Sequence, residues 1–155
     1  MIQIKDIKEE QIPAIVELVG RCGPYVQPHP DYYYWLFSHY GSAYTLYAEE
    51  DGCIIGFVSS FPMNCRENEI FVIQICVDNQ HRGQGIGEKL LDTLYQRHQS
   101  GGRCVLECTI SPKNLASQRT FRKLAAKYNG SWEWKETLFD GEIREQVFRV
   151  DIGNP

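Results

Sequence analysis

The chain has 155 residues, of which 43% are hydrophobic and 23% charged, and its formal net charge is −4. Its length is typical of one domain, which we expect to span residues 1–155 and to bury a sizeable core. The acidic balance argues against nucleic acid and anionic membranes as partners, and apolar runs such as 53–57 are too short to cross a bilayer. We therefore expect a cytoplasmic protein.

The first part of the chain predicts one strand and two helices. Residues 2–7 form the strand, and residues 12–19 carry apolar side chains at helical spacing until Gly20. A second, aromatic helix follows at 32–37 and ends at Gly41. Its predicted apolar stripe consists of Tyr33, Leu36, Phe37 and Tyr40.

Three strands are predicted next. Residues 44–49 and 53–61 are joined by Asp51-Gly52, a dipeptide typical of a tight β-hairpin. Residues 69–77 form a nearly continuous apolar run, which favours a central strand covered on both faces.

The remaining elements alternate before a final hairpin. A helix is predicted over 84–99, a strand over 103–110, and a helix from its N-cap Asn114 to about residue 128. Residues 132–139 and 142–150 then predict two strands that turn near 140–141. This order indicates a single α/β (α+β) domain, with a mixed, largely antiparallel sheet flanked by helices.

The segment Arg82-Gly83-Gln84-Gly85-Ile86-Gly87 lies between an apolar strand and an amphipathic helix. Glycines let the backbone approach a ligand closely, and amides at a helix N-terminus suit a phosphate. Glu88 stands where the dinucleotide motif and the Walker A motif each require glycine, so neither is present. The alternative is a glycine-rich turn that only redirects the chain.

This loop, which follows an apolar strand and precedes an amphipathic helix, resembles the [Q/R]-x-x-G-x-[G/A] pyrophosphate motif of GNAT acetyltransferases. The resemblance implies acetyl-CoA as the acetyl donor, with loop amides on its diphosphate and the main chain of the preceding strand along its pantetheine arm. The residues that it assigns to acetyl-CoA are Ile75, Cys76, Val77, Arg82, Gly83, Gln84, Gly85, Ile86, Gly87, Asn114, Ser117, Phe121 and Arg122.

Within that superfamily, segments 56–59, 71–77 and 106–117 resemble the diaminobutyrate acetyltransferases, and the likeness covers most of the chain. Two implied pocket positions depart from that pattern: residues 27–30 replace Asp-Leu-Asn-Ser, and Ile73 replaces a tryptophan. The acidic C-terminal cluster is reduced to about residues 142–145. The substrate-binding residues that the resemblance implies are Gln27, Tyr32, Ile73, Glu107 and Glu145.

Acetylation of an alkyl ammonium, with a pKa of about 10.4, requires a base near the amine. Glu107 is the predicted base because a carboxylate is unexpected in mid-strand; an ion pair with a nearby arginine or a solvent-facing position is the alternative. Tyr32 is a predicted acid or substrate contact, with core packing as its alternative. Glu145 either balances a cationic substrate or is a surface charge, and Phe121 stands where many GNAT enzymes place a tyrosine acid.

Six cysteines and four histidines show no metal-binding pattern, so we expect no metal site and free thiols. Cys76 and Cys108 have apolar flanks that favour packing over a covalent intermediate, and direct attack is expected.

The predicted function is acetyl transfer from acetyl-CoA to a primary amine of a small metabolite, such as a diamino acid. The alternatives are a protein or peptide N-acetyltransferase and a non-catalytic acetyl-CoA sensor. A C-terminal edge strand could pair across a two-fold axis in a homodimer.

Overall fold

The computed structural model describes residues 1–137 and 146–153, and in these ranges the elements follow the predicted order. The strands are β1 (Gln3–Asp6), β2 (Thr45–Glu50), β3 (Cys53–Pro62), β4 (Glu69–Val77), β5 (Cys104–Ile110), β6 (Ser131–Thr137) and β7 (Gln146–Ile152). The helices are α1 (Ile12–Arg21), α2 (Asp31–Tyr40), α3 (Ile86–His98) and α4 (Leu115–Lys127). None of these described helices is long and apolar enough to span a bilayer.

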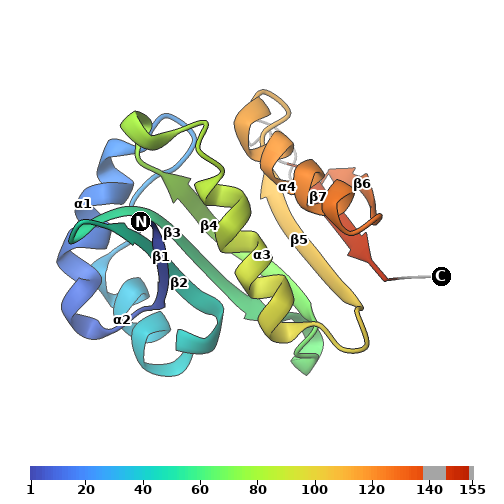
Figure 1. Ribbon diagram of the computed structural model, residues 1–155, viewed down its shortest axis with the longest axis horizontal. Helices are drawn as coiled ribbons and strands as arrows, with labels where there is room; N and C mark the ends of the chain where they lie inside the picture. Colours follow the sequence, from blue (N-terminus) through green and yellow to red (C-terminus); the bar gives the residue numbers. More distant parts are fainter. Residues whose placement is uncertain (138–145, 154–155) are drawn as a thin grey trace.

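The strands form one sheet in the order β1-β2-β3-β4-β5-β7-β6. Every neighbouring pair is antiparallel except β4 and β5, which confirms the mixed, largely antiparallel sheet. One core cluster packs α3 and α4 against the sheet, and another packs α1 and α2 against β2, β3 and β4 on the opposite face (Figure 1). The last strand of the chain, β7, lies inside the sheet between β5 and β6, so the edge strand near the C-terminus is β6.

Both predicted hairpins pair as antiparallel strands, but only the first has its turn within the described residues. Asp51 and Gly52 have φ values of 51° and 79°, the left-handed geometry of a two-residue hairpin turn, and the first prediction is confirmed. Strands β6 and β7 pair antiparallel, as predicted for the second hairpin. Its turn near 140–141 lies outside the described residues, as do Glu145 and the rest of segment 142–145.

The predicted stripe of α2 is wrong for Tyr40, which is 80% exposed, and it omits Tyr34, which is fully buried. Tyr34 faces the sheet because its ring packs on Phe57, with centroids 5.9 Å apart, and its hydroxyl meets the side chain of Gln74. A tyrosine can be buried at low cost when its hydroxyl has partners. Helical spacing alone did not reveal those partners.

Strand β4 contains a bulge that determines the geometry of the site. Ser59 of β3 pairs with Gln74, whereas Ser60 pairs with Val72, so Ile73 is an extra residue between two pairs. The insertion reverses the alternation of side chains: Val72 packs in the cluster of α3 and α4, and Cys76 in the cluster of α1 and α2.

Pairing between β4 and β5 covers Glu69–Val72 and Val105–Cys108 only, among the residues that the structure describes. Beyond Val72 the two strands part, as Figure 1 shows. The carboxyl-terminal half of β4 is therefore paired on one edge, to β3, and its other edge faces the opening.

Gly56 in β3 allows α3 to lie close to the sheet. A Cβ atom at this position would lie 2.9 Å from Cγ2 of Ile86 and 3.3 Å from Cδ1 of Leu90. Both contacts are shorter than the buried neighbours tolerate without moving. Since Ile86 begins α3, Gly56 also positions the helix terminus that follows the glycine loop.

We expect Gly56→Ala to lower the free energy of unfolding by about 1–3 kcal/mol, because overpacking displaces α3. Chemical denaturation measures the change. The matched control is Gly20→Ala, at an exposed helical position where a Cβ meets nothing within 4 Å; it should stabilise the protein by about 0.5–1 kcal/mol. Equal effects of both variants would contradict this account of Gly56.

Candidate active site

The glycine loop joins β4 to α3 and has the backbone geometry of an anion site. Gly83 and Gly85 adopt φ values of 80° and 76°, which glycine reaches without strain, and a Cβ at either position would meet nothing within 4 Å. Gly85 is the N-cap of α3, so the first amides of the helix point toward this open space with the positive end of its dipole. The arrangement suits a diphosphate.

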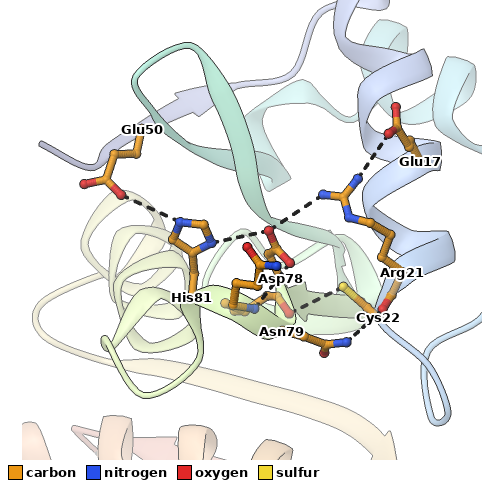
Figure 2. Close-up of polar contacts among 9 residues, drawn as sticks. Glu17, Arg21, Cys22, Glu50, Asp78, Asn79 and His81 are labelled. Carbon is orange, nitrogen blue, oxygen red and sulfur yellow. Dashed lines mark hydrogen bonds and ion pairs between the residues drawn. The ribbon is translucent and has the colours of Figure 1, made fainter.

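A polar network holds the start of this loop in place (Figure 2). His81 lies between two carboxylates, with Nδ1 3.3 Å from Asp78 and Nε2 4.0 Å from Glu50. Arg21, at the end of α1, lies 3.8 Å from the same Asp78 carboxylate, and Asn79 donates to the carbonyl of Arg21 at 3.1 Å. The contacts tie the loop to α1 and β2.

A cavity of about 390 Å³ lies beside the loop, between the end of β4 and the first turns of α4. Most of the residues predicted to bind acetyl-CoA line it. They are Ile75, Cys76, Val77, Arg82, Gly83, Gly85, Ile86, Gly87, Asn114 and Ser117. Gln84 belongs to the same loop but is not among the described lining residues.

Helix α4 adds two cations to this cavity that sequence reasoning missed. Arg119 and Lys123, four residues apart and hence on one face of the helix, both line it. Lys123 also pairs with Glu88 of α3, at 3.3 Å. Together with Arg82 they surround the cavity with positive charge that suits the phosphates of coenzyme A. The four-residue spacing could have shown that Arg119 and Lys123 share one face of α4. The sequence alone does not show that this face is turned toward the cavity.

A second cavity of about 490 Å³ lies where β4 and β5 have parted, against the loop between α1 and α2. Of the predicted residues, Gln27, Ile73 and Phe121 line this second cavity alone. The two cavities share the lining residues Tyr25, Val26, Ile75, Asn114 and Ser117. The two cavities are therefore neighbours that share a wall.

Asn114 occupies the predicted N-cap of α4, where its Oδ1 accepts a hydrogen bond from the amide of Ser117 at 3.2 Å. Its Nδ2 donates to the hydroxyl of Ser117 at 3.1 Å. The cap thus places both polar side chains at the boundary between the two cavities.

Glu107 is buried in β5 and held by two cations. Its Oε1 accepts hydrogen bonds from Lys135 at 2.9 Å and Arg149 at 3.1 Å. Arg149 also reaches Asp151 at 3.3 Å; burial opposes its charge, but the hydrogen bonds to these carboxylates raise the pKa of Arg149. An ion pair with arginine is therefore present, and the catalytic role of Glu107 stays a prediction.

Glu107 lines neither cavity, and Tyr32 and Arg122 also lie outside both described linings. Tyr32 is 68% exposed and lines neither cavity, whereas its neighbour Tyr33 packs inward on His29, with ring centroids 4.2 Å apart. Arg122 donates to Gln118 at 2.9 Å and stacks over Trp132 at 4.9 Å, outside both described linings. The roles assigned to Tyr32 and Arg122 stay predictions.

Cys76 lines the first cavity but is poorly suited to nucleophilic attack. A hydrogen bond with Cys22, together with burial, raises its pKa well above the usual value. The thiol form therefore dominates at neutral pH, which favours direct transfer over a covalent enzyme intermediate. No group of three or more potential metal ligands occurs within residues 1–137 and 146–153.

Comparison with known proteins agrees with this geometry. The model of the acetyltransferase (GNAT) family matches residues 12–126. The L-2,4-diaminobutyric acid acetyltransferase of Halalkalibacterium halodurans is 36% identical over 144 residues, which cover 90% of this chain and 75% of that protein. The enzyme of the same name from Marinococcus halophilus is 35% identical over 79% of this chain and 73% of its own length.

Solved structures show the same fold. Diaminobutyrate acetyltransferase from Paenibacillus lautus, in complex with its substrate and coenzyme A, has a TM-score of 0.82 at 24% identity, covering 97% of this chain and 94% of that chain. The ribosomal-protein-S18-alanine N-acetyltransferase of Escherichia coli has a TM-score of 0.72 at 18% identity, covering 98% and 93%. The resemblance inferred from the glycine loop is confirmed, and the chain belongs to the acetyltransferase (GNAT) family as an N-acetyltransferase that uses acetyl-CoA.

Proposed function

We propose that the acceptor is a small diamino acid of the 2,4-diaminobutyrate type, whose primary amine attacks the thioester of acetyl-CoA directly. The observation that carries the proposal is that the two cavities adjoin each other, with Ile75, Asn114 and Ser117 lining both. A space of about 490 Å³ on the acceptor side suits a small metabolite. The names of the relatives at 30–36% identity support the same substrate class.

The free edge of β4 would hold the donor. Beyond Val72 the main chain of β4 has no β5 partner among the described residues, so its amides and carbonyls facing the opening can pair with the pantetheine amides. With the diphosphate on the glycine loop, an arm that follows Val77 and Ile75 brings the thioester to the boundary of the two cavities. The amine then approaches from the acceptor side.

In the transfer itself, the C–N bond forms at the thioester carbonyl carbon, the C–S bond breaks, and the amine loses a proton. Glu107 is the proposed base: it lies two residues before Thr109, which lines the acceptor cavity, and it would act through a water molecule. Lys135 and Arg149 fix the orientation of its carboxylate. Because Tyr32 lines neither cavity, its proposed contact with the substrate requires its side chain to move toward the acceptor.

The leaving thiolate needs a proton or a hydrogen-bond donor. Phe121 has no hydroxyl to offer, whereas Tyr25 and Ser117 line both cavities. Tyr25 already donates its hydroxyl proton to the carbonyl of Lys113, at 3.3 Å. Ser117 is therefore the proposed donor to sulfur.

We further propose that the acetyltransferase unit spans residues 1–155. Strands β1, β6 and β7 lie outside the matched range 12–126 but pair into the same sheet. The edge position of β6 supports the proposed homodimer. Use of acetyl-CoA as the donor supports the proposed cytoplasmic location.

The proposed function predicts amine-dependent release of coenzyme A. A thiol-release assay with acetyl-CoA should show the highest kcat/KM for 2,4-diaminobutyrate among diaminobutyrate, ornithine, lysine, spermidine and a panel of peptides. Mass spectrometry of the product should show a single added acetyl group. Preference for a peptide, or release with no amine, would contradict the proposal.

Gly85→Ala should raise the dissociation constant of coenzyme A about tenfold, because a Cβ would project into the space for the diphosphate and a positive φ strains alanine. Isothermal titration calorimetry measures the change. Gly52→Ala is the matched control: Gly52 has a φ of 79° and open space at its Cβ but lies in the β2–β3 turn. An equal loss of affinity in both variants would contradict the assignment of the loop.

Glu107→Gln should lower kcat about 100-fold or more while the KM for acetyl-CoA changes little, since proton transfer and not donor binding is impaired. Steady-state kinetics with the best amine measures both. Glu133→Gln, an exposed carboxylate on β6 opposite Arg149, is the control and should retain full turnover. Unchanged kcat in Glu107→Gln would remove Glu107 from the reaction.

A further inference from the structure

Gln74 is a buried polar residue with both ends of its amide engaged. It is 7% exposed and follows Ile73, the extra residue of the bulge in β4. Its Nε2 donates to the carbonyl of Gln27 at 2.8 Å, and its Oε1 accepts from the hydroxyl of Tyr34 at 3.1 Å. The bulge therefore points an amide at the loop between α1 and α2.

Tyr34 makes a second connection to the same loop. Its hydroxyl accepts a hydrogen bond from the backbone amide of His29, at 3.2 Å. Burial raises the pKa of Tyr34, so the phenol keeps the proton that it donates to Gln74. One pair of side chains thus binds a carbonyl and an amide of the loop, two residues apart.

The loop needs such an anchor because of its sequence. Pro24, Pro28 and Pro30 have no backbone N–H, so segment 24–30 cannot pair continuously with a strand. It crosses the end of the sheet between α1 and α2 and carries four residues that line the acceptor cavity. These are Tyr25, Val26, Gln27 and His29.

We propose that Gln74 is a positioning residue for the acceptor: with Tyr34 it latches segment 25–29 against β4 and so sets the shape of the acceptor wall. The glycine loop makes none of these bonds, although Tyr25 and Val26 of the latched segment also line the donor cavity. Loss of the latch should therefore weaken acceptor binding far more than donor binding. The inference rests on the proposed function only in that the second cavity receives the amine.

Gln74→Met keeps the length of the side chain and removes both hydrogen bonds. We expect the KM for the best amine to rise about tenfold, with kcat and the dissociation constant of coenzyme A within about twofold of wild type. Tyr34→Phe leaves the bond from Gln74 to Gln27 and should raise that KM about threefold. Tyr95→Phe removes a comparable tyrosine bond, to the carbonyl of Gly102 at 2.9 Å, away from both cavities, and should leave the KM unchanged.

Hydrogen exchange tests the latch without turnover. The amide of His29, which donates to the Tyr34 hydroxyl that Gln74 holds in place, should exchange about tenfold faster in Gln74→Met than in wild type, while the amides of the glycine loop stay unchanged. Unchanged exchange at the His29 amide, or an unchanged KM in an active Gln74→Met, would overturn the inference. A lower melting temperature alone, with both quantities unchanged, would show a purely structural role. If wild type acetylates no amine, the proposed function fails, and exchange alone decides on the latch.

Discussion

The parting of β4 from β5 is the constraint on which the rest of this molecule depends. Four residue pairs join the strands between Glu69 and Val72, and the bulge at Ile73 follows at once. A bulge adds twist and turns side chains to the opposite face, which separates two strands that would otherwise continue side by side. The free edge of β4, the second cavity and the orientation of Gln74 all lie at or just beyond this inserted residue.

Much of the fold could be predicted because its signals are local. The Asp51-Gly52 turn, the glycine loop before α3 and the Asn114 cap each combine a residue type with a backbone requirement, and each is found in place. The bulge could not be predicted. In the run Glu69–Val77 nearly every side chain is apolar, so a change of face leaves no mark in the pattern.

Local chemistry alone predicted the candidate site only at the glycine loop, whereas Gln27, Ile73 and Ser117 were expected from the family resemblance. The loop from Arg82 to Gly87 is contiguous, so its chemistry can be inferred from the sequence. Glu107, by contrast, contacts Lys135 of β6 and Arg149 of β7, which lie 28 and 42 residues further along the chain. Local residue spacing cannot predict contacts over such separations. Tyr34 escaped prediction for the same reason, since Gln74 lies 40 residues away.

Net charge is a poor guide to this site. The chain carries a formal charge of −4, yet Arg82, Arg119 and Lys123 gather at one cavity with Glu88 as the carboxylate in its described lining. A field from a few cations a few ångströms away outweighs distant charges that salt screens. The cluster of Glu107, Lys135, Arg149 and Asp151 is neutral as a whole. It therefore fixes side chains on β5, β6 and β7 but contributes little to the electrostatic potential of the site.

Tyr25 spans the opening between the two halves of the sheet by a single hydrogen bond, from its hydroxyl to the carbonyl of Lys113. The side chain is 48% exposed, so water can replace that bond, and its net contribution is about 1 kcal/mol or less. The loop after α1 and the loop before α4 are therefore joined here by a weak contact, whose loss asks nothing of the helices and strands that carry the two loops.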